Sequence, residues 1–205
     1  MTELGLKLSS LLDLYNNKGA KISSAEPVFD LVTNEIPRII KNFCVGSCNS
    51  TFWEFEGSVG KGSWSRTPWI AMYDRRVTDR ASDGFYVAFI VQENMEKVFL
   101  LLMNSSTAHI NYTPFHLKVS DVEGLPSFQK GVIPSGLLAV SGRGNAPLFE
   151  KAALLWKSFS KEDLLGNVLE QDLVAILEQY QNLAKKYISS YPKDKPFKSN
   201  PFLSK

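Results

Sequence analysis

The chain has 205 residues, 44% of them hydrophobic and 21% charged, a composition typical of a folded globular domain with a substantial core. No apolar run approaches the roughly 18 residues that cross a membrane, and the N-terminus lacks the pattern of a signal peptide, so we expect a cytoplasmic protein. The net charge is only +2, so affinity for nucleic acid would have to come from locally clustered cations.

Two amphipathic helices are predicted before residue 45. In the first, residues 3–17, leucines recur at helical spacing. The second begins at Pro27, which suits a first helical turn, and its apolar pattern continues to Phe43. Pro37 lies inside that pattern and is predicted to kink the helix or to split it.

Four strands are predicted next, as an antiparallel meander. TFWEFEG (51–57) and WIAMYD (69–74) are rich in strand-forming residues, and a glycine- and serine-rich loop separates them. GFYVAFIV (84–91) and KVFLLLM (97–103) are apolar throughout, as expected of central strands covered on both faces. The segment QENMEK joins these two strands as a short hairpin connection.

The remainder is predicted to hold one more strand and one long helix. The segment from 104 to 144 is largely irregular, with a short strand at FHLKV (115–119). AALLWKSF (152–159) fits a strand or a helix, and its length and strand-forming residues favour a strand. Apolar spacing predicts a helix from Val168 to Tyr187, with Asn167 as its N-cap.

These elements indicate an α+β fold, a single domain with an antiparallel-rich central sheet flanked by helices. The domain is expected to cover residues 1–188. The tail, residues 189–205, is rich in proline and lysine and is interpreted as a linker leaving the domain.

The sequence argues against catalysis and against a metal site. GSVGKGS (57–63) lacks the spacing of a phosphate-binding P-loop, and GRGNAP (142–147) lacks the third glycine of a dinucleotide fingerprint. A Cys2His2 zinc site would have to combine Cys44, Cys48, His109 and His116. Three residues separate the cysteines and six separate the histidines, which does not match the usual close pairs of zinc ligands. We expect no metal, no cofactor and no enzymatic activity in this chain.

Cations and aromatic residues gather around the strand 69–74 and predict a nucleic-acid-binding surface. The cations lie in the loops on either side of this strand: Lys61, Arg66, Arg75, Arg76 and Arg80. The aromatic residues among them are Trp64, Trp69, Tyr73 and Tyr86. Cations bind phosphates, and exposed rings stack on unpaired bases at about 1–3 kcal/mol per base. Alternatively, Asp74, Asp79 and Asp83 neutralise the arginines and the rings belong to the core.

A longer pattern gives this surface a more specific interpretation. TPWIAMYD is followed, after a polar turn, by DGFYVAFIVQENMEKVFLLLMN, with NEIPRIIK upstream and FEKAALLWKSF and EQYQNLA downstream. Together these segments resemble the N-terminal domain of McrB-type modification-dependent restriction proteins. The resemblance implies a domain that flips a methylated cytosine out of duplex DNA into an aromatic-lined pocket. It also implies two partners, a GTP-hydrolysing AAA+ motor in cis or in trans and a separate McrC-like nuclease.

The resemblance assigns roles to individual residues. It places Trp69 on the pocket wall and Ile90 beneath the base, and it aligns Phe149 with a stacking tyrosine of the pocket. Tyr86 is a further candidate for a wall or a wedge. A flipped base loses a few kcal/mol of stacking, which two aromatic faces can recover.

One position departs from the family pattern. The family member with the best-described pocket has a tyrosine in the glycine loop that fills the gap left by the flipped base, and Lys61 stands at that position here. A lysine can hold a phosphate but cannot replace a stacked base. Either Trp64 takes this role, or base flipping is altered or absent. The alternatives are therefore sequence-specific binding of unmodified DNA without flipping, and a protein-interaction module.

Overall fold

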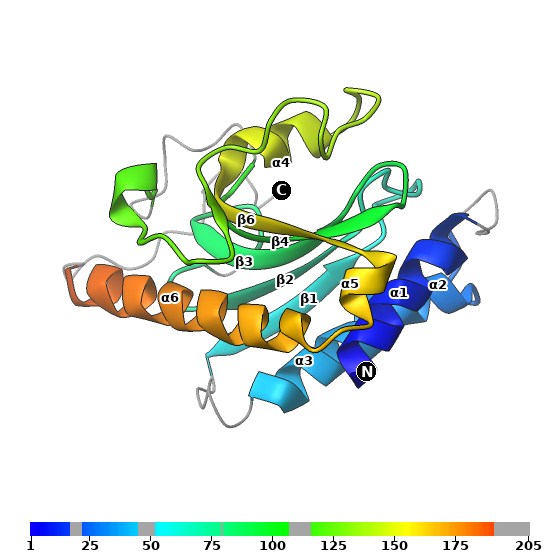
Figure 1. Cartoon of the computed structure of the whole chain (residues 1–205), viewed down its shortest axis with the longest axis horizontal. Helices are drawn as coiled ribbons and strands as arrows, with labels where there is room; N and C mark the ends of the chain where they lie inside the picture. Colours follow the sequence, from blue (N-terminus) through cyan, green and yellow to red (C-terminus); the bar gives the residue numbers. More distant parts are fainter. Residues whose placement is uncertain (17–21, 45–51, 79, 107–115, 191–205) are drawn as a thin grey trace, which may run out of the picture.

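A six-stranded sheet organises the protein. The computed structural model describes residues 1–16, 22–44, 52–78, 80–106 and 116–190. The strands follow the order β1-β2-β3-β4-β6-β5, and every neighbouring pair is antiparallel. Helices lie on both sides of the sheet (Figure 1), which confirms the predicted α+β fold.

The strands form the centre of the core. Their bounds are β1 Trp53–Ser58, β2 Trp69–Asp74, β3 Phe85–Val91, β4 Lys97–Asn104, β5 Gln129–Lys130 and β6 Ala153–Ser160. The four strands of the predicted meander are confirmed, and so is the strand preferred for 152–159. β3 and β4 occupy the centre and are almost completely buried, as their uninterrupted apolar sequences indicated.

The predicted short strand at 115–119 is wrong. His116 to Lys118 have no regular secondary structure, and a 3-10 turn, Val119–Asp121, follows. The Asn104 side chain takes the place of a strand partner, because its Nδ2 donates to the Leu117 carbonyl (2.9 Å) and its Oδ1 accepts from the Leu117 amide (3.0 Å). A single buried amide thus satisfies the backbone that a ladder would otherwise have paired.

Six α-helices are present in the described residues: α1 Glu3–Asn16, α2 Pro27–Asp30, α3 Ile36–Cys44, α4 Ala146–Ala152, α5 Lys161–Leu164 and α6 Val168–Ser190. α1 and α6 confirm two of the predictions, and α6 starts directly after Asn167 as expected. None of the described helices is both long and apolar enough to span a membrane.

Pro37 is accommodated by a wide helical turn. A π-helical segment, Leu31–Glu35, joins α2 to α3, and the Ile36 amide donates to the Leu31 carbonyl five residues earlier. A proline has no amide proton and its ring crowds the carbonyl four residues before it, so a locally wider turn relieves both problems. The predicted helix is therefore divided into α2 and α3, as expected. The two parts are joined by the wide turn and not separated by a break in the chain's helical path.

The two faces of the sheet are covered differently (Figure 1). We call the first the α6 face, defined by Trp53, Phe85 and Lys157. Trp53 and Phe85 pack edge-on against Tyr180 of α6, with ring centroids 5.2 and 5.4 Å away, and Lys157 Nζ lies 2.6 Å from Asp172 Oδ2. The N-terminal helices extend this layer over β1.

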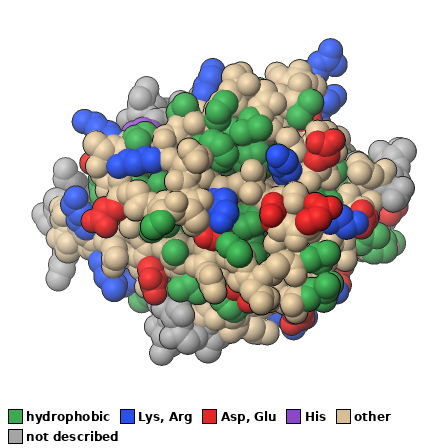
Figure 2. Space-filling model, viewed as in Figure 1, with side chains coloured by type: hydrophobic (Ala, Val, Ile, Leu, Met, Phe, Trp, Pro, Cys, Tyr) green, Lys and Arg blue, Asp and Glu red, His purple; other side chains and the backbone are tan. Residues whose placement is uncertain are grey.

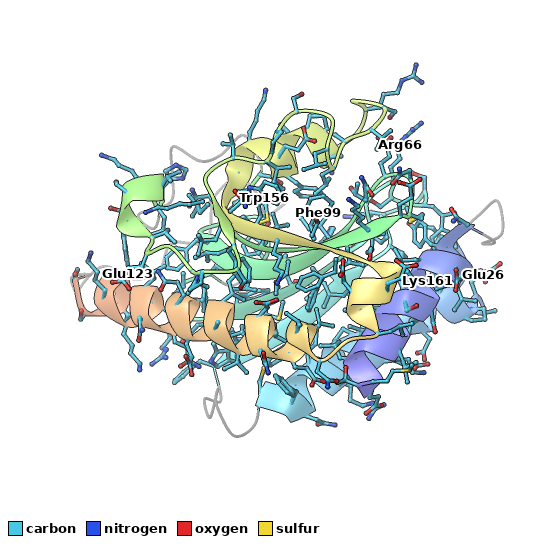
Figure 3. The ribbon with its side chains drawn as sticks, viewed as in Figure 1. Glu26, Arg66, Phe99, Glu123, Trp156 and Lys161 are labelled. Carbon is cyan, nitrogen blue, oxygen red and sulfur yellow. The ribbon has the colours of Figure 1, made fainter. Side chains whose placement is uncertain are left out.

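We call the second the α4 face, defined by Trp69, Ile90, Phe99 and Trp156, which the strand register places on one side. The Phe99 and Trp156 rings lie 6.1 Å apart, and α4 packs over β4. Figure 3 labels both rings between β6 and α4, and Figure 2 shows apolar side chains gathered in that region.

The loops leave the sheet at two opposite ends. At the hairpin end, residues 59–68 join β1 to β2 and residues 92–96 join β3 to β4. At the turn end, residues 75–84 join β2 to β3. The six residues of β2 run from one end to the other, about 17 Å at about 3.3 Å per residue.

Candidate nucleic-acid interface

Trp69 and Ile90 lie side by side on the α4 face, at the hairpin end. They are paired residues in the β2–β3 ladder, so their side chains project from the same side of the sheet. Trp69 is partly buried and Ile90 is 1% exposed. The juxtaposition of a tryptophan wall and an apolar floor, suggested by the family resemblance, is therefore available in this fold.

The other two pocket candidates lie on different elements, Phe149 on α4 and Tyr86 at the far end of β3. Phe149 is buried in α4, the helix that packs over β4 on the same face. Tyr86 also faces this side, but it is four residues from Ile90 along β3, about 13 Å away at the turn end. Burial raises the pKa of the Tyr86 hydroxyl above its ordinary value. The fold therefore groups Trp69 with Ile90 and holds Tyr86 apart from them.

Gln92 adds a polar group that the sequence analysis did not single out. It directly follows β3, two residues after Ile90, and its backbone amide donates to the Lys97 carbonyl (2.9 Å). The alternation of the strand therefore continues to Gln92 and places both side chains on the α4 face. Its Nε2 donates to the Leu137 carbonyl (2.7 Å), while its buried Oε1 has no hydrogen-bond partner among the described residues. A buried unpaired acceptor costs about 1–3 kcal/mol.

The glycine loop at the hairpin end is anchored to the first helix. Tyr15 of α1 donates its hydroxyl proton to the Ser65 carbonyl (2.5 Å) and contacts the Trp64 ring edge-on, with centroids 5.8 Å apart. Gly60 has φ +114°, and a Cβ there would lie 2.2 Å from the Ser63 carbonyl oxygen, so only glycine fits. Trp64 is thus packed inward, whereas Lys61 is exposed at the tip of the loop.

Arg66 belongs to a clamp that joins three loops at the hairpin end, where Figure 3 labels it. Its Nη1 lies 2.9 Å from Glu93 Oε1 and 3.3 Å from Ser141 Oγ. Ser141 donates its amide to Glu93 Oε2 (2.5 Å) and its hydroxyl to Oε1. Desolvation raises the pKa of the Glu93 carboxyl, but the hydrogen bonds from Ser141 and the Arg66 guanidinium outweigh it and leave this pKa below its ordinary value.

The remaining predicted cations lie at the turn end, and each is paired with an acidic side chain. Arg75 pairs with Glu54, Arg76 Nη2 lies 2.6 Å from Asp74 Oδ2, and Arg80 Nε lies 2.8 Å from Asp83 Oδ2. Arg76 also covers the Phe52 ring at 4.5 Å. The neutralisation considered from the sequence is present for Asp74 and Asp83, and Asp79 lies outside the described residues.

Two of the four possible zinc ligands lie within the described residues. Cys48 and His109 lie outside the described residues, Cys44 is buried at the end of α3, and His116 is exposed. Within the described ranges, no three His, Cys, Asp or Glu side chains form a group that could hold a metal ion.

A family model described as MrcB-like, N-terminal domain, matches residues 10–185. The chain belongs to this family. The match covers most of the chain and confirms the resemblance drawn from the central strands. Membership in the MrcB-like N-terminal family supports a DNA-binding domain of a restriction system of the McrB/McrC type. No curated protein matches the sequence.

Proposed function

We propose that this MrcB-like domain recognises a modified base in duplex DNA, a methylated cytosine, by flipping it into a pocket on the α4 face at the hairpin end. Family membership supports the DNA-binding part of this proposal. The observation that carries the base-recognition part is the placement of Trp69, Ile90 and the unpaired Gln92 acceptor on one face of neighbouring strands.

The chemistry of these three side chains fits methylated cytosine. Cytosine carries an amino donor at N4 next to C5, where the methyl group is attached. Gln92 Oε1 would accept from the amino group, and Ile90 would contact the methyl group. Trp69 would stack on the base from one side and Phe149 of α4 from the other, which returns stacking energy lost on flipping. Tyr86 would take part only indirectly, because it lies at the turn end.

The phosphate contacts are proposed to come chiefly from the hairpin end. Lys61 is exposed, Arg66 keeps 52% of its side chain exposed despite its ion pair, and the β1–β2 loop contains no acidic residue. Arg75, Arg76 and Arg80 form a second, charge-compensated group at the turn end. In this proposal the domain, residues 1–188, delivers specificity in the cytoplasm to an AAA+ motor and a McrC-like nuclease, with residues 189–205 as the linker.

The test is a fluorescence-polarisation panel of unmodified, hemimethylated and fully methylated duplexes across a salt series. The wild-type domain is expected to prefer the modified duplexes. Trp69→Ala should abolish this preference while leaving some affinity for all three, because phosphate contacts are independent of sequence. Trp53→Ala is the matched control, since Trp53 is also a partly buried strand tryptophan but lies on the α6 face.

Each outcome of the panel is decisive. No binding to any duplex at low salt would eliminate DNA recognition and favour a protein-interaction module. Equal affinity for modified and plain DNA would favour sequence-specific binding without flipping. That second candidate has support of its own, because Trp64 packs against Tyr15 and Lys61 cannot replace a stacked base.

A further inference from the structure

The loop from Val140 to Gly144 presents an apolar side chain and a cation to solvent beside Arg66. Val140 is 53% exposed, although the two residues before it, Leu138 and Ala139, are almost completely buried. Arg143 is also exposed. A Cβ built on Gly144 would lie 3.8 Å from Arg66 Cδ, so the loop touches the hairpin end directly.

This loop is held in place from both sides. Glu93 accepts the Ser141 amide and hydroxyl, and Glu150 Oε1 accepts the amides of Leu138 and Ala139 at 2.9 Å each. The Glu93 amide also donates to the Leu138 carbonyl (3.2 Å). An exposed valine on a loop with this many side-chain anchors is presented in a fixed position, which reduces the entropy lost on binding.

The backbone between the anchors makes a tight turn. The Gly142 amide donates to the Ala139 carbonyl (2.9 Å), and Gly142 and Gly144 adopt φ of +66° and +68°. A Cβ on Gly142 would meet nothing within 4 Å, so this glycine serves the turn rather than close packing. The turn brings Val140 and Arg143 to the outside of the loop.

The charge of this region suits DNA. The sequence from Gly124 to Phe149 contains Lys130 and Arg143 and no acidic residue, and Arg66 compensates the nearby Glu93. Figure 2 shows Lys or Arg side chains at the upper right, over the loop that precedes α4 in Figure 1. An exposed apolar residue flanked by cations, without acidic neighbours on its own loop, matches a surface that enters a DNA groove.

We infer that the Val140–Gly144 loop is the element that enters the duplex, with Val140 as the wedge beside the flipped base and Arg143 as a phosphate contact. This inference rests on the proposed function and deepens it. It supplies the apolar wedge that neither the exposed Lys61 nor the inward-packed Trp64 provides. Arg66 joins the wedge to the base pocket, because it contacts Ser141 and lies three residues before Trp69.

The wedge is tested with methylated duplexes that carry 2-aminopurine next to the target cytosine, whose fluorescence rises when its neighbour leaves the stack. Val140→Ser should reduce this rise severalfold, and Val140→Phe should retain it, because a larger apolar side chain can fill the same gap. Val168→Ser is the matched control, since Val168 is 50% exposed at the start of α6.

The cation is tested by the salt dependence of binding. Arg143→Ala should weaken binding to modified and plain duplexes alike and lower the salt slope by about 1, whereas Arg38→Ala, an exposed arginine on α3, should not. If the wild-type domain shows no fluorescence rise and no preference for modified DNA, the proposed function itself fails. If the wild type shows both and the Val140 and Arg143 variants behave like their controls, the loop assignment alone is overturned.

Discussion

The side-chain amide of Gln92 has two halves in unequal environments. Its nitrogen donates to Leu137, and its oxygen is buried without a partner among the described residues. The bond to Leu137 fixes which half is the oxygen, because a carbonyl can only accept. An acceptor left unpaired beside an apolar floor destabilises the free protein and becomes favourable only when a donor arrives.

Gln92→Met separates these two effects. Methionine has similar length and removes the unpaired oxygen, so the free energy of unfolding is expected to stay within about 1 kcal/mol of wild type, despite the lost bond to Leu137. The preference for methylated over plain duplexes should fall, because the amino group loses its acceptor. Chemical denaturation and the polarisation panel measure the two quantities. A Gln92→Met variant that discriminates as well as wild type would remove Gln92 from the pocket.

At the scale of the residue, the pocket candidates came from the family resemblance, and their neighbours came only from the structure. Trp69 and Ile90 were put together by the family resemblance, and the β2–β3 register shows that they are paired residues. Gln92 was not identified, because its unpaired oxygen depends on the position of Leu137, which lies 45 residues away in an irregular segment. Arg143 was also not identified, because it lies in the same irregular part of the chain, where the sequence pattern does not predict its neighbours.

Among the elements, the three loops of the hairpin end act as one unit. Glu93 of the β3–β4 hairpin binds Arg66 of the β1–β2 loop and Ser141 of the loop before α4. The long helices could be predicted from their helical apolar spacing, and the main strands from strand-forming residues or uninterrupted apolar runs. The contact among these loops could not be predicted, because it joins side chains that are far apart in the sequence. Their sequence separations are 27, 48 and 75 positions.

This clamp is expected to loosen in acid. The pKa of Glu93 is lowered in the folded protein, so the stabilisation it contributes is present above the ordinary glutamate pKa and is lost as the pH falls through the lowered value. NMR titration should show the Glu93 carboxyl protonating at a pH below the ordinary pKa of a glutamate. The Ser141 amide should report the same transition.

Two variants make this titration specific to the clamp. Glu93→Gln removes the ionisable group, so the Ser141 amide shift should no longer follow pH in this range. Arg66→Ala removes one of the groups that favour the charged carboxylate and should raise the pKa of Glu93. A carboxyl that titrates at or above its ordinary value in the wild-type domain would contradict the clamp.

At the scale of the whole molecule, the sheet separates two groups of cations that are close in sequence. Lys61 and Arg66 lie at the hairpin end, and Arg75, Arg76 and Arg80 lie at the turn end, about 17 Å away along β2. The sequence suggested one surface because all five fall within 20 residues. A strand that joins the two loops necessarily carries them to opposite ends of the sheet. Which of the two groups lies beside the proposed base pocket therefore follows only from the structure.

The difference between the two ends predicts a difference in salt dependence. Lys61→Ala should lower the slope of log affinity against log salt by about 1, because it removes one phosphate contact. Arg75→Ala should change the slope by less, since Arg75 is already paired with Glu54 and binding a phosphate would require breaking that pair. Both variants change an exposed cation, so they serve as controls for each other. Equal changes in slope would mean that the duplex contacts both ends of the sheet, as the sequence first suggested, and that the ion pairs at the turn end open when DNA binds.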